Sequence, residues 1–159
     1  MDLLDRLLEH DHWATTQLLE LSRGLTGAQL DQEFDIGHRS LRGTFEHIIV
    51  NIGFWTLLMT GQPIDGRPVD GSLAALSDRH ERSYATFATL ARQLRDEQRL
   101  DDTFIDHYDA RKSFGGTILH VVLHNAEHRT EVLHILEHLD LPDVPEVDHG
   151  LWDYELLNG

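Results

Sequence analysis

Four long segments of the chain place an apolar residue at every third or fourth position, which is the spacing of amphipathic α-helices. The predicted helices cover residues 3–25, 40–59, 72–99 and 117–139. Ser40 and Ser72 are suited to cap the second and third helices, because a serine hydroxyl can accept a hydrogen bond from the first helical turn. The pattern predicts an all-α protein, a four-helix bundle that forms a single domain over residues 1–159.

Glycine and proline residues mark the predicted connections between these helices. They lie near the end of the first helix (Gly24, Gly27), at the end of the second helix and in the loop over residues 62–71 that follows it (Gly61, Pro63, Gly66, Pro68), and on either side of the fourth helix (Gly115, Gly116, Pro142). Residues 101–112 alternate only weakly between apolar and polar, so either a short hairpin or an irregular crossing is expected there. The tail from Val144 to Gly159 carries Trp152, and we expect it to pack back onto the bundle.

Charge and cysteine content narrow the possible functions. The chain has 13 Lys and Arg against 28 Asp and Glu, a formal charge of −15, which argues against nucleic-acid binding because phosphate contacts need clustered basic residues. The absence of cysteine excludes disulfides, a thiolate ligand and a thiol nucleophile. Any metal must be held by His, Asp or Glu, and any thiol chemistry must come with the substrate.

The ends and the most apolar stretch of the chain give no indication of a membrane partner. The first residues are acidic, whereas a signal peptide needs a basic start and an unbroken apolar region, so we expect a cytoplasmic protein. The most apolar stretch, residues 45–59, is interrupted by His47 and Asn51 and is too short to cross a bilayer. Because this helix is apolar on nearly every face, we expect a homodimer to cover the surplus surface.

Twelve histidines are unusual for a chain of 159 residues, and five of them lie in the predicted helix 117–139. Successive helical residues advance by about 100° around the axis, so histidines four positions apart share one face. The apolar residues of this helix place His124 and His128 at the edge of the buried face. The other polar residues lie on the flank toward solvent: His120, Glu127, Glu131, His134 and His138. The pair His124 and His128 is therefore predicted to face the interior, although a solvated polar face is the alternative.

His47 is the candidate for a third metal ligand from another helix. Its neighbours in the helix 40–59 are apolar, so we expect a buried imidazole, with a hydrogen-bonded core histidine as the alternative. Three neutral imidazoles would leave a divalent ion its full charge and an open coordination position, as in catalytic zinc sites. Ligation by imidazole alone favours zinc or nickel.

Asp11 and His80 are polar residues on otherwise apolar helix stripes. A buried carboxylate needs a partner. For Asp11 two roles stay open: it orients a metal-ligating histidine from the second coordination shell, or it bonds to a tyrosine, a water or the backbone. His80 is expected to be a hydrogen-bonded core residue.

A different metal site is also conceivable. The Glu-x-x-His spacing of di-iron bundle proteins occurs at Glu9 and His12 and again at Glu131 and His134. Helix periodicity argues against this alternative, because all four residues point away from the apolar stripes of their helices.

Three segments of the sequence resemble the DinB family of small four-helix proteins, which is grouped with the YfiT-like metal-dependent hydrolases. Residues 10–15 resemble the family's N-terminal motif, residues 40–49 with Trp55 and Gly61 its second-helix pattern, and residues 120–129 its fourth-helix pattern. The chain departs from the family pattern at Thr130 and Glu131, where Gly-Gln is usual, and at Asp11, where Asn is common.

The resemblance implies a divalent metal held by His47, His124 and His128, and often a homodimer. It also implies a small-molecule substrate: family members act as S-transferases that use bacillithiol, mycothiol or similar low-molecular-weight thiols, and some are maleylpyruvate isomerases. The family name reflects induction by DNA damage, which does not imply DNA binding. A metal-bound water would instead make a hydrolase, and a non-catalytic metal-binding dimer is the third hypothesis.

Overall fold

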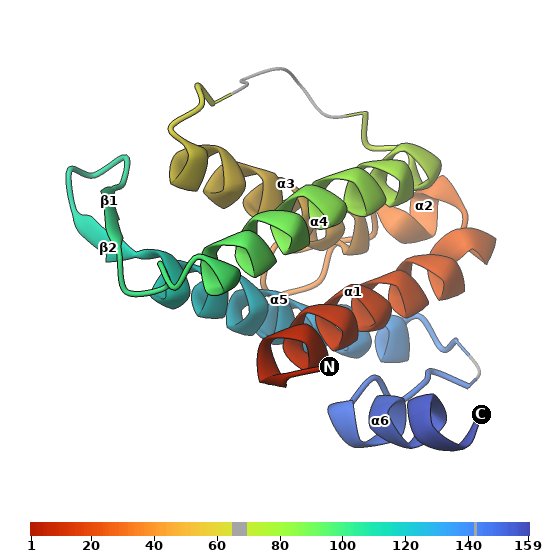
Figure 1. Cartoon of the computed structure of the whole chain (residues 1–159). Coiled ribbons are helices and arrows are strands. Elements are labelled where there is room, and N and C mark those ends of the chain that lie inside the picture. Colours follow the sequence, from red (N-terminus) through yellow and green to blue (C-terminus); the bar gives the residue numbers. More distant parts are fainter. Residues whose placement is uncertain (65–69, 142) are drawn as a thin grey trace.

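The computed structural model describes residues 1–64, 70–141 and 143–159, and four long helices lie side by side in it (Figure 1). They are α1 (Leu3–Leu21), α3 (Leu41–Thr60), α4 (Leu73–Asp96) and α5 (Phe114–His138). Helix α3 packs on α4 and α5, and α1 packs on the same two helices from the other side. Helices α1 and α3 therefore occupy opposite corners of the bundle, and the predicted all-α four-helix bundle is confirmed.

Serine caps begin three of the four long helices. The hydroxyls of Ser40, Ser72 and Ser113 each accept a hydrogen bond from a backbone N–H in the first turn of α3, α4 and α5. Helix α3 ends at Gly61, whose φ of 67° is the left-handed conformation that glycine adopts without steric cost. The predictions for helices 40–59 and 72–99 are confirmed to within a few residues.

The first predicted helix, 3–25, is wrong beyond Leu21. A short 3₁₀ helix, η1 (Ser22–Gly24), follows α1, and then a separate helix begins, α2 (Gly27–Leu30). The cause is a second N-terminal cap: Thr26 accepts from the Gln29 backbone N–H, and the Gln29 side chain accepts from the Thr26 N–H. This reciprocal pair starts a new helix at Gly27, whereas the apolar periodicity alone had predicted that the first helix extends to residue 25.

The start predicted for the last long helix, Thr117, is also wrong, because α5 begins at Phe114. Gly115 and Gly116 lie inside its first turn instead of ending the preceding loop. The Gly115 N–H donates to the Leu100 carbonyl at 2.7 Å, and a Cβ at Gly115 would lie only 3.1 Å from that oxygen. The glycine therefore serves a close backbone approach. Gly66, Pro68 and Pro142 lie outside the described residues.

Residues 103–113 form a hairpin, the first of the two conformations expected for this segment. Strand β1 (Thr103–Ile105) pairs antiparallel with β2 (Arg111–Ser113). The Asp106 carboxylate accepts hydrogen bonds from the backbone N–H groups of Tyr108 and Ala110, which closes the turn. The His107 ring lies 4.9 Å from the Phe54 ring between centroids, so the hairpin tip contacts α3.

The C-terminal tail packs on α1, as predicted, and it contains a further helix, α6 (His149–Asn158). Trp152 is buried, and its ring lies 6.0 Å from that of His10 between centroids. Nε2 of His10 donates to the Val147 carbonyl at 2.9 Å. Arg6 of α1 forms an ion pair with Asp153 of α6.

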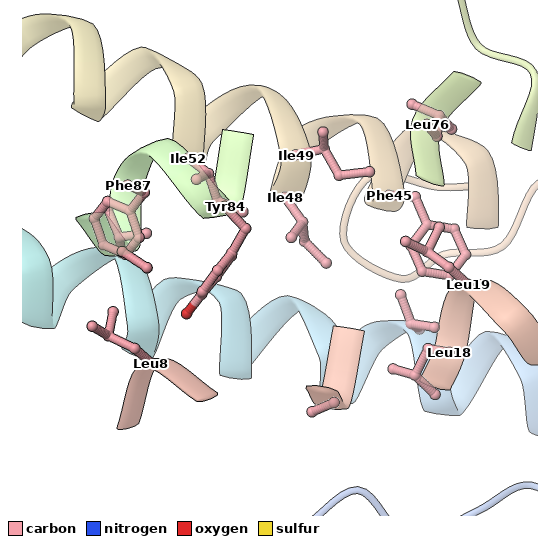
Figure 2. Packing of buried hydrophobic residues seen from close by; sticks show 14 of the residues in the cluster. Leu8, Leu18, Leu19, Phe45, Ile48, Ile49, Ile52, Leu76, Tyr84 and Phe87 are labelled. Carbon is pink, nitrogen blue, oxygen red and sulfur yellow. The ribbon is translucent and has the colours of Figure 1, made fainter. Parts of the chain in front are cut away.

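The apolar core lies between all four long helices. Figure 2 shows side chains such as Leu8 of α1, Ile52 of α3 and Phe87 of α4 meeting there, and all three are fully buried. This burial of apolar surface is the main favourable contribution to the stability of the bundle.

A buried polar network crosses this core. The Asp11 carboxylate of α1 is fully buried and accepts hydrogen bonds from Tyr84 of α4 at 2.9 Å and Asn125 of α5 at 2.8 Å. Arg129 of α5, itself only 4% exposed, forms an ion pair with the same carboxylate and lies 3.2 Å from Thr15. One carboxylate thus joins three of the four long helices.

The expected homodimer stays a prediction, because α3 buries only part of its apolar surface within the chain. Most large apolar side chains on the core-facing side of α3 are fully buried by the chain itself: Leu41, Phe45, Ile48, Ile49 and Ile52. Apolar surface stays exposed on α3, where Val50 is 36% exposed, and on α5, where Leu119 and Leu123 are 48% and 54% exposed. Across the described part of the chain, each helix is too short or too polar to span a bilayer.

Replacing Asp11 by Ala should lower the free energy of unfolding by about 3–5 kcal/mol, because it leaves the Arg129 guanidinium buried without a counter-charge. Urea unfolding followed by circular dichroism measures this loss. The control is Glu33→Ala, which breaks the exposed ion pair with Arg39 and should cost less than about 1 kcal/mol. Equal small losses in both variants would contradict the importance of the buried network.

Candidate metal site

Three histidine rings from two helices converge between α3 and α5. Nε2 of His124 lies 2.9 Å from Nε2 of His47 and 3.2 Å from Nε2 of His128. His47 comes from α3, and the other two come from consecutive turns of α5. The structure therefore brings together the three histidines that the sequence predicted as metal ligands, and all three rings are partly buried.

A fourth ring, that of His38, closes one side of this group and was not predicted. It stacks on the His47 ring at 3.7 Å between centroids, and it lies 5.1 Å from the His128 ring. One ring nitrogen from each of His38, His47 and His128 lies within 4.8 Å of the others. His38 lies in the segment before α3, where helix periodicity gives no direction. The one sequence feature that could have indicated His38 is its position two residues before the Ser40 cap, near the start of the helix that carries His47.

Two polar side chains hold the outer nitrogens of the α5 histidines. Nδ1 of His128 lies 2.7 Å from Oε2 of Glu131, and Nδ2 of Asn51 lies 3.1 Å from Nδ1 of His124. A carboxylate can only accept, so Nδ1 of His128 carries the proton and its Nε2 keeps a lone pair. Glu131 lies on the flank of α5, where its side chain is 28% exposed and turns back one helical turn toward His128.

Glu131 also fixes the loop that carries His38. Gly37 has a φ of 42°, and a Cβ built on it would overlap the Glu131 carboxylate. The left-handed backbone favours glycine here, and a larger residue would also displace the Glu131 carboxylate. The contact ties the position of His38 to that of His128.

The environment keeps the central rings neutral. The pKa of His47 is lowered to about 4, mainly by burial and also by the neighbouring His38 and His128. Burial likewise lowers the pKa of His124 to about 4, with His128 and His47 as the next causes. Burial also lowers the pKa of His38. Neutral imidazoles present lone pairs, which metal coordination needs.

The donor set fits a divalent transition metal. Imidazole nitrogens that bind one zinc ion at 2.0–2.1 Å in tetrahedral geometry lie about 3.3 Å apart. The spacings of 2.9 and 3.2 Å around His124 are within a few tenths of an ångström of that value. The Glu131 contact to His128 matches the carboxylate–histidine pair that commonly supports a ligand.

Other candidates lie away from this cluster. The Asp11 carboxylate bonds to Tyr84, Asn125 and Arg129 in the core. Of the two roles left open for Asp11, the structure therefore shows the hydrogen bond to a tyrosine. Glu131 and Asn51, not Asp11, contact the outer ring nitrogens of His128 and His124. The predicted outer histidines are all exposed: His120, His134 and His138.

The four residues of the di-iron alternative do not share one site. Glu131 bonds to His128, His134 points to solvent, and His12 bonds to Glu81 of α4. Glu9 lies 3.4 Å from the Arg92 guanidinium instead.

A pocket of about 430 Å³ opens next to His47. Its wall combines polar side chains near the histidines, including Glu46 and Asn51, with apolar Val50 and Phe54 along α3. The pocket can admit a small molecule to the histidine cluster from solvent.

Comparison with known proteins identifies the family. The family model described as DinB superfamily matches residues 10–132, which include α3, α4, parts of α1 and α5, and the histidines of the cluster. A search of curated protein sequences found no match.

The metal-free protein should lose stability as the pH falls from about 6.5 to 4. In that range unfolded histidines take up protons at their ordinary pKa, whereas folded His47 and His124 have pKa values of about 4 and do not. Urea unfolding at a series of pH values measures the slope. His124→Asn should reduce the slope by up to one proton, and His134→Asn, at an exposed position, should not change it. An unchanged slope in His124→Asn would contradict the assignment.

Proposed function

The chain belongs to the DinB superfamily, and from this premise we propose that it is a metal-dependent enzyme that transfers a low-molecular-weight thiol to an electrophilic substrate. The proposed ligands are His47, His124 and His128, and zinc or nickel is the proposed ion. The observation that carries the proposal is the close approach of Nε2 of His124 to Nε2 of His47, at 2.9 Å, and to Nε2 of His128, at 3.2 Å.

A divalent ion in this site would supply a positive charge that favours the deprotonated form of a thiol. The protein side chains prepare the site for that ion. Glu131 holds the proton of His128 on Nδ1, and Asn51 can turn its amide so that the oxygen accepts from Nδ1 of His124. The Glu131 contact leaves the Nε2 lone pair of His128 free, and the turned Asn51 amide would do the same for His124.

The pocket beside His47 is suited to a small organic thiol. Val50 and Phe54 give it an apolar wall that can contact the carbon atoms of the thiol, and Glu46 and Asn51 can contact its polar groups. The chain has no cysteine, so the thiol must enter as a second substrate. In the transfer, sulfur forms a bond to the electrophilic carbon and the thiol loses its proton. The carbon gives up the electron pair of one bond, either to a leaving group or, in an addition, to the neighbouring atom, which then takes up a proton. We propose Glu46, a carboxylate of the pocket wall, as the group that accepts the proton of the thiol.

The test measures conjugate formation between a panel of thiols, including bacillithiol and mycothiol, and a model electrophile. Zinc- or nickel-loaded protein should form the conjugate, and metal-stripped protein and His124→Ala should lose at least about 100-fold in rate, because both remove the charge at the reaction centre. His134→Ala is the matched control and should retain the wild-type rate. Ester hydrolysis without conjugation, or metal binding without either activity, would contradict the proposal.

We also propose a homodimer, now on different grounds from those of the sequence. Exposed Leu119 of α5 borders an apolar groove of about 380 Å³ that includes Leu3 and Leu7 of α1. Light scattering at micromolar concentration should give twice the chain mass, and Leu119→Glu should give the single chain mass. A monomeric wild-type protein would overturn this proposal.

A further inference from the structure

A second cluster of ligand-type side chains lies between α1 and α4, across the bundle from the α3–α5 histidines. We propose that His12, His80 and Glu81 form a second divalent-cation site, separate from the first. The proposal does not depend on the proposed thiol transfer.

The three side chains are already close together. One ligand atom from each lies within 4.8 Å of the other two. Nε2 of His12 lies 3.0 Å from Oε1 of Glu81, and the His12 and His80 rings stack at 5.1 Å between centroids. Helices α1 and α4 are neighbours along much of their length (Figure 1), so the ligands come from two rigid elements.

His80 gives independent evidence for a ligand. Its side chain is fully buried, and among the described residues its Nδ1 has no hydrogen-bond partner. Its Nε2 faces the backbone carbonyl of His12 at 3.5 Å, and a carbonyl can only accept, so Nε2 carries the proton. Nδ1 therefore keeps a lone pair, and leaving such a buried atom unpaired is unfavourable. Ligating histidines usually have this arrangement, with the other ring N–H donated to a carbonyl or carboxylate.

A hydrogen bond between His12 and Glu81 would explain their contact but not the unpaired Nδ1 of His80. A cation bound among the three residues explains both. The side chains of His12 and Glu81 are 34% and 56% exposed, so an ion can reach the cluster from solvent. The adjoining pocket of about 180 Å³ has room for water to complete the coordination.

The donor set indicates the class of ion. Two imidazoles and one carboxylate suit a borderline cation such as Zn²⁺, whereas Mg²⁺ and Ca²⁺ prefer oxygen ligands. The Glu81 and Glu9 carboxylates line the pocket with a single guanidinium, that of Arg92, and so favour a bound cation. A cation held by His12 of α1 and by His80 and Glu81 of α4 would clamp the two helices together.

Zinc titration of tag-free protein against a chelating indicator tests the proposal by stoichiometry. Wild-type protein should bind two Zn²⁺ per chain, and Glu81→Gln and His12→Gln should each bind one. Glu81 and His12 are chosen because they reach the surface, whereas His80→Ala would leave a hole in the core. Glu137→Gln, an exposed glutamate on α5, is the matched control and should bind two.

The double variant separates this proposal from the proposed function. His124→Gln should also bind one Zn²⁺, and His124→Gln with Glu81→Gln should bind none. One Zn²⁺ in the wild type that Glu81→Gln retains would overturn the second site and leave the first intact. One Zn²⁺ that only Glu81→Gln removes would overturn the first site and leave the second.

Thermal unfolding gives a second readout. With free Zn²⁺ at 100 times its dissociation constant, the melting temperature of His124→Gln should rise by about 5–10 °C, because the ion binds only the folded bundle. The same concentration should not raise that of the double variant. An equal rise in both would place the zinc elsewhere and overturn the proposal.

Discussion

The buried carboxylate of Asp11 is the interaction on which the arrangement of the bundle depends. It accepts hydrogen bonds from Tyr84 and Asn125 and forms an ion pair with Arg129, so it fixes the positions of α4 and α5 relative to α1. Asn125 and Arg129 directly follow His124 and His128 in α5. Neighbouring helical residues point about 100° apart. Because Asn125 and Arg129 bond to α1, the histidines that precede them turn toward α3 and His47. The core network and the histidine cluster are therefore two consequences of one helix rotation.

The sequence predicted the bundle well because its signals are local and repeated. Each long helix has an apolar stripe, and Ser40, Ser72 and Gly61 mark helix ends with ordinary capping geometry. The errors came where a tertiary or reciprocal contact decides the outcome. The Thr26 and Gln29 pair starts α2, and the approach of Gly115 to Leu100 allows α5 to begin at Phe114. The spacing of apolar residues along the chain does not reveal either contact.

The candidate site shows the same division. Helix phase was enough to select His124 and His128 from five histidines of α5, and the apolar surroundings of His47 indicated the third. His38 was missed because it lies in a loop whose direction depends on Gly37 packing against Glu131. The contact between Glu131 and His128 was missed, although their three-residue spacing was a usable signal. For Asp11, periodicity showed burial, but only the fold shows which of its possible partners are near.

The central claim is that the three Nε2 atoms of His47, His124 and His128 surround one divalent ion. Anomalous diffraction at the zinc edge, from crystals of zinc-loaded Glu81→Gln protein, tests it most directly because this variant lacks a ligand of the α1–α4 cluster. The account predicts one strong anomalous peak between α3 and α5, about 2.1 Å from each of the three Nε2 atoms. A strongest peak outside this cluster, or one that only one of the three rings contacts, would contradict it.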